Sequence, residues 1–288
     1  HDGEAVTCDD FVAAMQDASG IDLAQFKRWY SQAGTPQVTA SESYDASNQC
    51  YRLKLLQTTP DTAGQTDKRP QHIPFDIELI DSEGNSLVNQ VLDFKQQTQE
   101  FVFENISAKP FVSLLQDFSA PVKLDFDYSI EQLLHLMRFA NSEVAKWEAS
   151  VSLFSQAVWQ CVASLQNDKA MHIDSRLVDG FKGVLLSENL NEALMAEILT
   201  LTTASALIEQ TNNVDLDSLA LARQFVVLEI AQGCEDELAA KVRQLHLVKT
   251  AEARALKNVC LNLLLKVDDG YRELAKLQYQ SSDNMTDT

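Results

Sequence analysis

The spacing of hydrophobic residues changes twice along the chain. Near the start, Phe11, Val12 and Met15 recur at helical spacing. From about residue 37 to residue 129, apolar and polar positions alternate, as in strands with one buried face. After this stretch, spacings of three and four residues return. The pattern predicts an α+β protein of several domains: a short helical segment, a β domain and an all-α domain.

The first segment is expected to form two short helices. Thr7 is a good N-cap and is followed by acidic residues in the first turn, where carboxylates favour the positive end of the helix dipole. A second helix is predicted from Ile21 to Tyr30, after a break at Ser19-Gly20. Gly34 can then adopt a positive φ that ends the helix, so the stretch Phe26–Pro36 marks the change from helix to strand.

The β domain is expected to be an antiparallel β-sandwich of seven short strands. The stretch Asp81–Asn85 has the composition of a turn. The stretch Thr59–Pro70 is rich in Thr, Asp, Gly and Pro, which predicts an exposed loop between strands. The predicted strands are 50–58, 72–80, 87–94 and 99–106, with others near Val38, near Leu114 and at 122–128.

The rest of the chain predicts antiparallel helix pairs, arranged as a bundle or as a curved stack. Ser129 can cap a first helix that runs to Phe139, and a long helix follows with an apolar stripe from Val144 to Leu165. The polar residues 281–288 are expected to form a loop between helices. The further predicted helices are 173–186, 191–199, 216–230, 235–247 and 250–267.

Length and charge restrict the possible classes of function. A chain of 288 residues with 45% hydrophobic residues can form two domains with sizeable cores. The formal net charge of -19 excludes nucleic acid and anionic membrane surfaces as partners, because binding to phosphates depends on Lys and Arg. No apolar run approaches the roughly 20 residues of a membrane span.

The N-terminus and the cysteines indicate the origin of the chain. Its start, His1 to Glu4, is too polar for a signal peptide and lacks Met, so we expect a processed chain or one cut from a longer protein. Five widely spaced cysteines predict free, buried thiols in a reducing compartment, and hence a cytoplasmic protein. The glycosylation sequons at Asn105 and Asn284 are then expected to be unmodified.

The histidines do not form a metal-binding motif. A zinc peptidase needs two His side chains one helical turn apart and a Glu that activates water. No His-Glu-x-x-His sequence is present, and Met171–Asp174 offers only one His and one carboxylate. The acidic stretch Cys234–Glu237 predicts a solvated helix start. The isolated histidines, each predicted to be a surface or packing residue, are His1, His72, His135, His172 and His246.

Motifs for other chemistry are also missing from the sequence. No Gly-x-Ser-x-Gly elbow occurs, and Cys161 and Cys260 lie at apolar helix positions, so buried thiols are expected. Gly180 and Gly183 form only a glycine pair inside an amphipathic helix. The pairs Asp125/Asp127 and Asp215/Asp217 lack the other ligands of a calcium loop. The residues therefore give no catalytic, cofactor-binding or metal-ligating assignment.

Several stretches of the chain resemble sequences of a known family, and they occur in the same order as in that family. The longest are His1–Phe11, which reads His-Asp-Gly-Glu-Ala-Val-Thr-Cys-Asp-Asp-Phe, and Phe26–Pro36. Together they closely resemble the bacterial alanyl aminopeptidase N family of gluzincin zinc metallopeptidases. Further matching stretches are His72–Phe75, Phe118–Leu124, Ala196–Leu201 and Asn284–Asp287.

The resemblance implies a domain plan and a parent activity. Residues 1–33 would be the tail of a thermolysin-like catalytic domain, 34–128 the β-sandwich domain, and 129–288 the first part of a helical domain that limits access to short peptides. Members of the family remove N-terminal residues from peptides with a zinc ion. Their zinc ligands and catalytic residues would lie upstream of His1, so none is carried onto this chain. We expect a non-catalytic fragment that acts as a spacer and an access-limiting wall.

Two alternatives remain open at this stage. The chain could be a free-standing protein-interaction module, or an unrelated hydrolase that uses Cys161 or Cys260. In the fragment hypothesis, Phe11, Phe26 and Trp29 would face the missing catalytic domain. The apolar ends of a truncated helix stack would then favour self-association.

Overall fold

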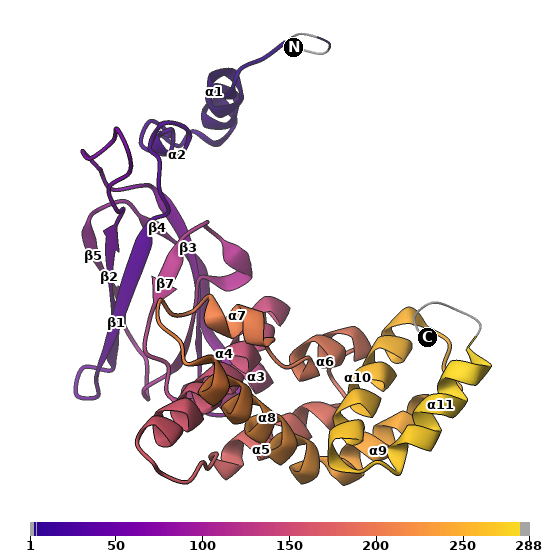
Figure 1. Cartoon of the computed structure of the whole chain (residues 1–288). Coiled ribbons are helices and arrows are strands. Elements are labelled where there is room, and N and C mark those ends of the chain that lie inside the picture. Colours follow the sequence, from indigo (N-terminus) through magenta and orange to yellow (C-terminus); the bar gives the residue numbers. More distant parts are fainter. Residues whose placement is uncertain (1–2, 4, 283–288) are drawn as a thin grey trace. The chain divides into compact units, whose positions relative to one another are not determined.

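A computed structural model describes residues 3 and 5–282 of the chain. These residues form two compact units that divide between Tyr128 and Ser129 (Figure 1). The first unit contains a short helical segment and a β-sandwich, and the second is entirely helical. No helix in the described part of the chain is long and apolar enough to cross a membrane.

The N-terminal helical segment is less regular than its sequence predicts. Helix α1 (Cys8–Ser19) starts with the predicted Thr7 cap and ends at Gly20, whose φ is +69°. Only Val12 of this helix is buried. Helix α2 (Arg28–Ser31) is shorter than the predicted 21–30. Turns replace its first part, where the carboxylate of Asp22 accepts a hydrogen bond from the N–H of Ala24 and thereby competes with helical pairing.

Seven strands form the predicted sandwich, in two sheets. One sheet has the order β5-β2-β1-β7 and the other the order β4-β3-β6. All pairs are antiparallel except β1 with β7, which is parallel. The predicted turn at 81–85 is present. The N–H of Asp81 donates to the carbonyl of Asn85, and the carboxylate of Asp81 accepts from the N–H of Asn85. The strands are β1 (Gln37–Asp45), β2 (Cys50–Thr58), β3 (Ile73–Ile80), β4 (Ser86–Phe94), β5 (Thr98–Phe103), β6 (Phe111–Leu114) and β7 (Lys123–Asp125).

Alternating side chains fill the space between the two sheets. Leu53 and Leu55 of β2 and Phe75 and Ile77 of β3 are fully buried in a single apolar cluster. Because successive side chains of a strand point to opposite faces, these alternating positions all reach the core. Trp29 of α2 also packs against this cluster, which is a correction to the expectation that it faces a missing domain.

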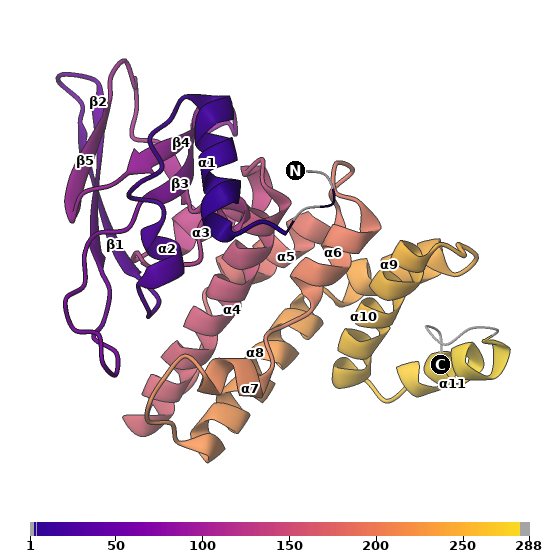
Figure 2. The same ribbon diagram turned by 90° about the horizontal axis from the view of Figure 1, so that it is seen from above.

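The second unit is a series of helices that pack as neighbours (Figure 2). Two of these helices were not predicted from the sequence. Helix α7 (Ala204–Ile208) is very short, and helix α11 (Tyr271–Ser281) is strongly polar. The helices are α3 (Ile130–Phe139), α4 (Glu143–Gln166), α5 (Ser175–Leu185), α6 (Glu192–Leu199), α7 (Ala204–Ile208), α8 (Leu216–Gly233), α9 (Glu235–Leu245), α10 (Ala251–Val267) and α11 (Tyr271–Ser281). Residues 283–288 lie outside the described part, so the predicted loop at 281–288 stays a prediction except that Ser281 ends α11.

Two glycines lie where helices of this unit pack tightly against one another. A Cβ on Gly180 of α5 would lie 2.5 Å from Cδ2 of Leu134 in α3. A Cβ on Gly233 at the end of α8 would lie 2.4 Å from Cγ1 of Val178 in α5. Both distances are shorter than atoms tolerate, so the missing side chains let these helices approach one another. Gly180, which the sequence marked only as one of a glycine pair, therefore has a packing role.

Candidate functional site

The histidines whose side chains the structure describes are engaged in packing or lie on the surface. Nε2 of His72 lies 2.6 Å from Oδ1 of Asp93. The ring of His135 packs against Phe139, with 4.7 Å between ring centroids. His246 is the exposed C-cap residue of α9. No three His, Cys, Asp or Glu side chains in the described ranges are grouped as metal ligands would be. The His, Cys, Asp and Glu side chains of the described residues therefore do not offer the ligands that a zinc ion needs.

Three buried cysteines, Cys161, Cys234 and Cys260, are in surroundings that favour the thiol form. Burial raises the pKa of Cys234 and of Cys260, in each case to about 12. Burial also raises the pKa of Cys161, whose Sγ–H points to the carbonyl of His172 at 3.6 Å. A nucleophilic cysteine needs its thiolate near neutral pH, and these shifts have the opposite direction. The hydrolase alternative therefore has no support in the geometry of Cys161 or Cys260.

Several acidic residues that the sequence singled out cap helices. Asp174 accepts hydrogen bonds from the N–H and the guanidinium of Arg176, which lower the pKa of Asp174. Asp215 accepts from the N–H groups of Asp217 and Ser218 at the start of α8. Cys234 immediately precedes α9, so the acidic stretch 235–237 is the first turn of a helix, as predicted. These contacts give Asp174 and Asp215 a structural role as helix caps.

A surface hollow of about 450 Å³ lies beside α4. Its polar groups bind one another: Nε1 of Trp159 donates to Oε1 of Gln210 (2.9 Å), and Nε2 of Gln210 donates to Oγ of Ser155 (3.3 Å). The lining residues, none of them charged, are Val151, Ser152, Ser155, Gln156, Trp159 and Gln210. The lining of the hollow therefore points to no particular ligand.

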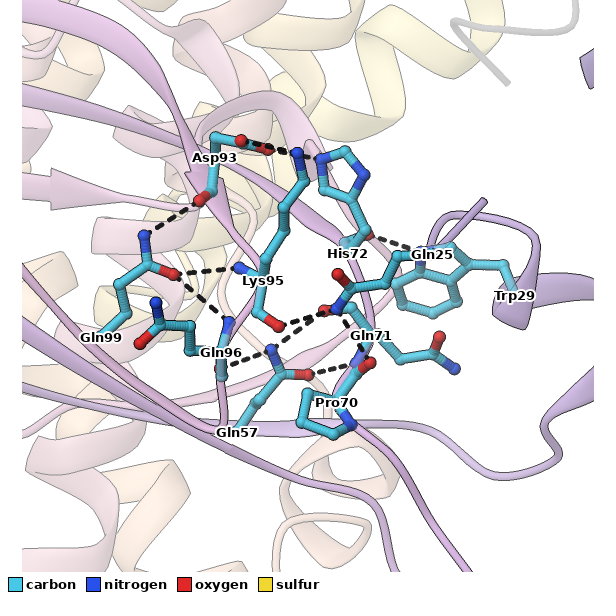
Figure 3. A network of polar contacts seen from close by, with 10 residues as sticks. All are labelled: Gln25, Trp29, Gln57, Pro70, Gln71, His72, Asp93, Lys95, Gln96 and Gln99. Atoms are coloured by element: carbon cyan, nitrogen blue, oxygen red, sulfur yellow. Dashed lines mark hydrogen bonds and ion pairs between the residues drawn. The ribbon is translucent and has the colours of Figure 1, made fainter. Parts of the chain in front are cut away.

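The most extensive polar site lies where the helical segment meets the sandwich (Figure 3). We call it the joint, and define it as residues 25–32 together with residues 69–72 and Lys95. Four side chains at positions i, i+3, i+4 and i+7 of the segment donate to main-chain carbonyls across the joint. The bonds are from Gln25 to Pro70 (3.1 Å) and Lys95 (2.7 Å), from Arg28 to Pro70, from Trp29 to His72 (2.8 Å), and from Gln32 to Arg69 (3.0 Å).

A buried glutamine of the sandwich organises the other side of the joint. Gln57 is 3% exposed, and its side chain makes three hydrogen bonds, all to main-chain groups. Its Oε1 accepts from the N–H of Gln71 (2.7 Å), and its Nε2 donates to the carbonyls of Gln71 and Gln96 (both 3.0 Å; Figure 3). Because its polar atoms are satisfied, Gln57 fixes the extended backbone of residues 70–72.

Charges flank this backbone on β4. Asp93 receives Nε2 of His72 at 2.6 Å and Nζ of Lys95 at 2.8 Å (Figure 3). Burial opposes the charge of Asp93, but the hydrogen bonds and charges of Lys95 and His72 keep the pKa of Asp93 below its ordinary value. The edge of the Phe26 ring packs against the ring of His72, with centroids 5.9 Å apart. Phe26 therefore faces the sandwich, contrary to the expectation from the sequence.

The loop that was expected to be exposed also holds the helical segment. Nζ of Lys68 donates to the carbonyl of Ala33, to Oγ1 of Thr62 and to Oε1 of Gln65, each at 2.8 Å. Gln65 also donates to the carbonyl of Ser31 (3.0 Å). The loop 59–70 is thus partly solvated, but two of its polar side chains, Gln65 and Lys68, bind the main chain at the end of α2.

Comparison with known proteins assigns both units to described domains. Residues 34–127 match a domain of unknown function, DUF3458, with an Ig-like fold. Residues 130–288 match its C-terminal companion, DUF3458_C, described as ARM repeats. The chain belongs to the DUF3458_C family, whose model matches more than half of its residues. Its fold class is the predicted one, a two-sheet sandwich followed by a helical stack.

Relatives of this DUF3458 chain include three bacterial proteins named Aminopeptidase N. The chain is 39% identical to that of Escherichia coli, 36% to that of Haemophilus influenzae and 31% to that of Caulobacter vibrioides. Each alignment covers 100% of this chain but only 34% or 35% of the relative. The resemblance to aminopeptidase N is confirmed, and the chain spans about a third of the length of these relatives.

A solved structure gives the same result for the fold. The crystal structure of Legionella pneumophila aminopeptidase A in complex with aspartic acid matches 99% of this DUF3458 chain, with a TM-score of 0.87 and 29% identity. The match covers 34% of that protein. The residues of the joint could not be identified as a site from the sequence, because its partners are about 40 positions apart along the chain.

Proposed function

We propose that this chain is a non-catalytic part of a zinc-dependent aminopeptidase of the N type, whose catalytic groups lie elsewhere in a longer polypeptide. One observation carries the proposal: the chain aligns along its whole length with only 35% of Aminopeptidase N. The parent would remove N-terminal amino acids from peptides, and this part would contact peptides only within the parent.

Two mechanical roles follow for the two units. The sandwich would act as a spacer, because two sheets packed on a shared core form a stable block. The helical unit would act as a wall that limits access to short peptides, since stacks of helix pairs form extended surfaces. Residues 1–33 would be the tail of the catalytic domain. Phe11, which is 55% exposed, supports this part of the proposal because it could pack on that domain.

The cellular compartment is part of the same proposal. The five cysteines are free, and four of them are buried. Free thiols are stable in a reducing environment, which supports a cytoplasmic location.

An activity assay tests the proposal directly. The chain is incubated with an alanyl chromogenic amide and added zinc, next to Escherichia coli Aminopeptidase N as a positive control. We expect no turnover by the chain. Turnover at a rate like that of the control would overturn the proposal, and so would an upstream coding sequence without a His-Glu-x-x-His motif.

A further inference from the structure

The joint differs from an ordinary connection between a helix and a domain. Side chains of the helical segment donate to the main-chain carbonyls of Arg69, Pro70, His72 and Lys95. In addition, Oε1 of Gln32 accepts from the N–H of Arg69 (2.8 Å). The acceptors lie just before β3 and just after β4, beyond the last strand pair Ile73–Phe94, so the segment supplies partners for main-chain groups at the end of the sheet. Such groups cost free energy when they are buried without partners.

Helix α2 is too short to be stable without contacts to the sandwich. Helix α2 has four residues, and isolated helices shorter than about 12 residues are marginal in water. Its stability must therefore come from the sandwich. The main-chain N–H groups of Trp29, Tyr30 and Gln32 are bonded within the segment, and that of Ala33 donates to Oε1 of Gln65 (2.7 Å).

We propose that the joint is a rigid coupling, in which the face formed by Gln25, Arg28, Trp29 and Gln32 locks the preceding chain onto the sandwich. The coupling fixes the direction in which residues 5–24 leave the sandwich. Helix α1 follows this direction because Nζ of Lys27 pairs with Oδ1 of Asp9 (2.7 Å) and Oε1 of Gln16 accepts from the N–H of Leu23 (3.1 Å). The proposal stands on this geometry and does not depend on the proposed function.

Hydrogen exchange of the whole chain tests the coupling. In the unsubstituted chain we expect the amides of residues 29, 30, 32 and 33 to be protected. A variant with Gln25→Ala, Arg28→Ala, Trp29→Phe and Gln32→Ala removes the donors while retaining an aromatic ring at position 29. Since each such bond contributes a factor of roughly 3 to 10, protection should fall about 100-fold or more.

Two comparisons make the exchange result decisive. A control variant with Tyr30→Ala and Ser31→Ala changes exposed side chains of the same helix and should leave protection unchanged. The amides of β3 serve as an internal reference, because their unchanged protection shows that the sandwich of the variant is folded. Unprotected amides at 29–33 in the unsubstituted chain, or equal protection in the four-fold variant, would overturn the proposal.

Distance measurements test rigidity itself. Cys8 is exposed and the other four cysteines are buried, so spin labels can be attached at Cys8 and at a second cysteine introduced by Ser41→Cys on the exposed side of β1. A rigid coupling predicts one narrow distance distribution, which broadens when the four donors are removed. A broad distribution with the donors in place would contradict the proposal.

Discussion

Two carboxyl groups of the sandwich, those of Asp76 and Asp93, have opposite effects on stability at neutral pH. Asp76 on β3 and Asp93 on β4 lie in the same sheet. Burial raises the pKa of Asp76, and the charges of Asp117 and Glu78 add to this effect. Asp93 has a lowered pKa because Lys95 and His72 offset the effect of its burial. The pKa values of these two carboxyl groups are thus shifted in opposite directions.

Replacing Asp76 by Asn should stabilise the chain at neutral pH. A carboxyl with a raised pKa binds its proton more tightly in the folded state, so stability falls as the pH rises from 3.8 through the folded pKa. Above that range the charged Asp76 costs stability, and Asn removes this cost. We expect a higher melting temperature at pH 7 for Asp76→Asn, and a difference that disappears towards pH 3.

The matched control is Asp93→Asn, for which the sign is reversed. The lowered pKa of Asp93 contributes stability above about pH 4, which is lost as the pH falls through the folded pKa. This variant should melt at a lower temperature at pH 7. A stabilised Asp93→Asn, or an unstabilised Asp76→Asn, would show that the two environments are not as described. Both melting temperatures are measured by circular dichroism.

At the scale of elements, local patterns determined most of the fold. Strand β2 has the predicted bounds 50–58, and Ser129 caps α3 as predicted, because alternation and capping depend on neighbouring residues. Helices α7 and α11 and the shortened α2 were not predicted. Their sequences are short or polar, and α2 depends on residues about 40 positions away, which no local pattern contains.

Helix spacing gives a prediction at this scale. Gly233→Ala places a methyl group against Val178, whose branched side chain is stiff, so we expect a loss of about 1–3 kcal/mol of unfolding free energy. Gly183→Ala in α5 is the control, because nothing lies within 4 Å of the added Cβ. It should stabilise the chain by about 0.5–1 kcal/mol, since Ala favours helix over Gly.

Urea unfolding of both variants measures these effects. If Gly233→Ala were as stable as the unsubstituted chain, α8 and α5 would not be in the close contact described. If Gly183→Ala were strongly destabilised, its position would not be open.

For the whole molecule, charge and exposed apolar surface act against each other. The net charge of -19 opposes association of two copies. The helical unit nevertheless exposes large apolar side chains, among them Leu247 at 84%. Others are Leu216, Leu221, Leu277 and Tyr279. Salt screens the repulsion and leaves the apolar attraction in place.

We therefore expect self-association that increases with salt. Sedimentation velocity at high protein concentration should show more dimer or larger species at about 0.5 M NaCl than at low salt. Leu247→Gln should reduce this association, while Leu56→Gln on the sandwich, which is 38% exposed, serves as a control. A strict monomer at every salt concentration would contradict the prediction.

The joint also affects how the protein should be divided for experiments. The DUF3458 match begins at residue 34, whereas the side chains that donate to the carbonyls of Arg69, Pro70 and His72 lie at positions 25–32. A recombinant sandwich that begins at residue 34 would lose these donors and expose to solvent the part of the apolar cluster that Trp29 covers. Expression trials that begin before Gln25 should yield the more soluble product.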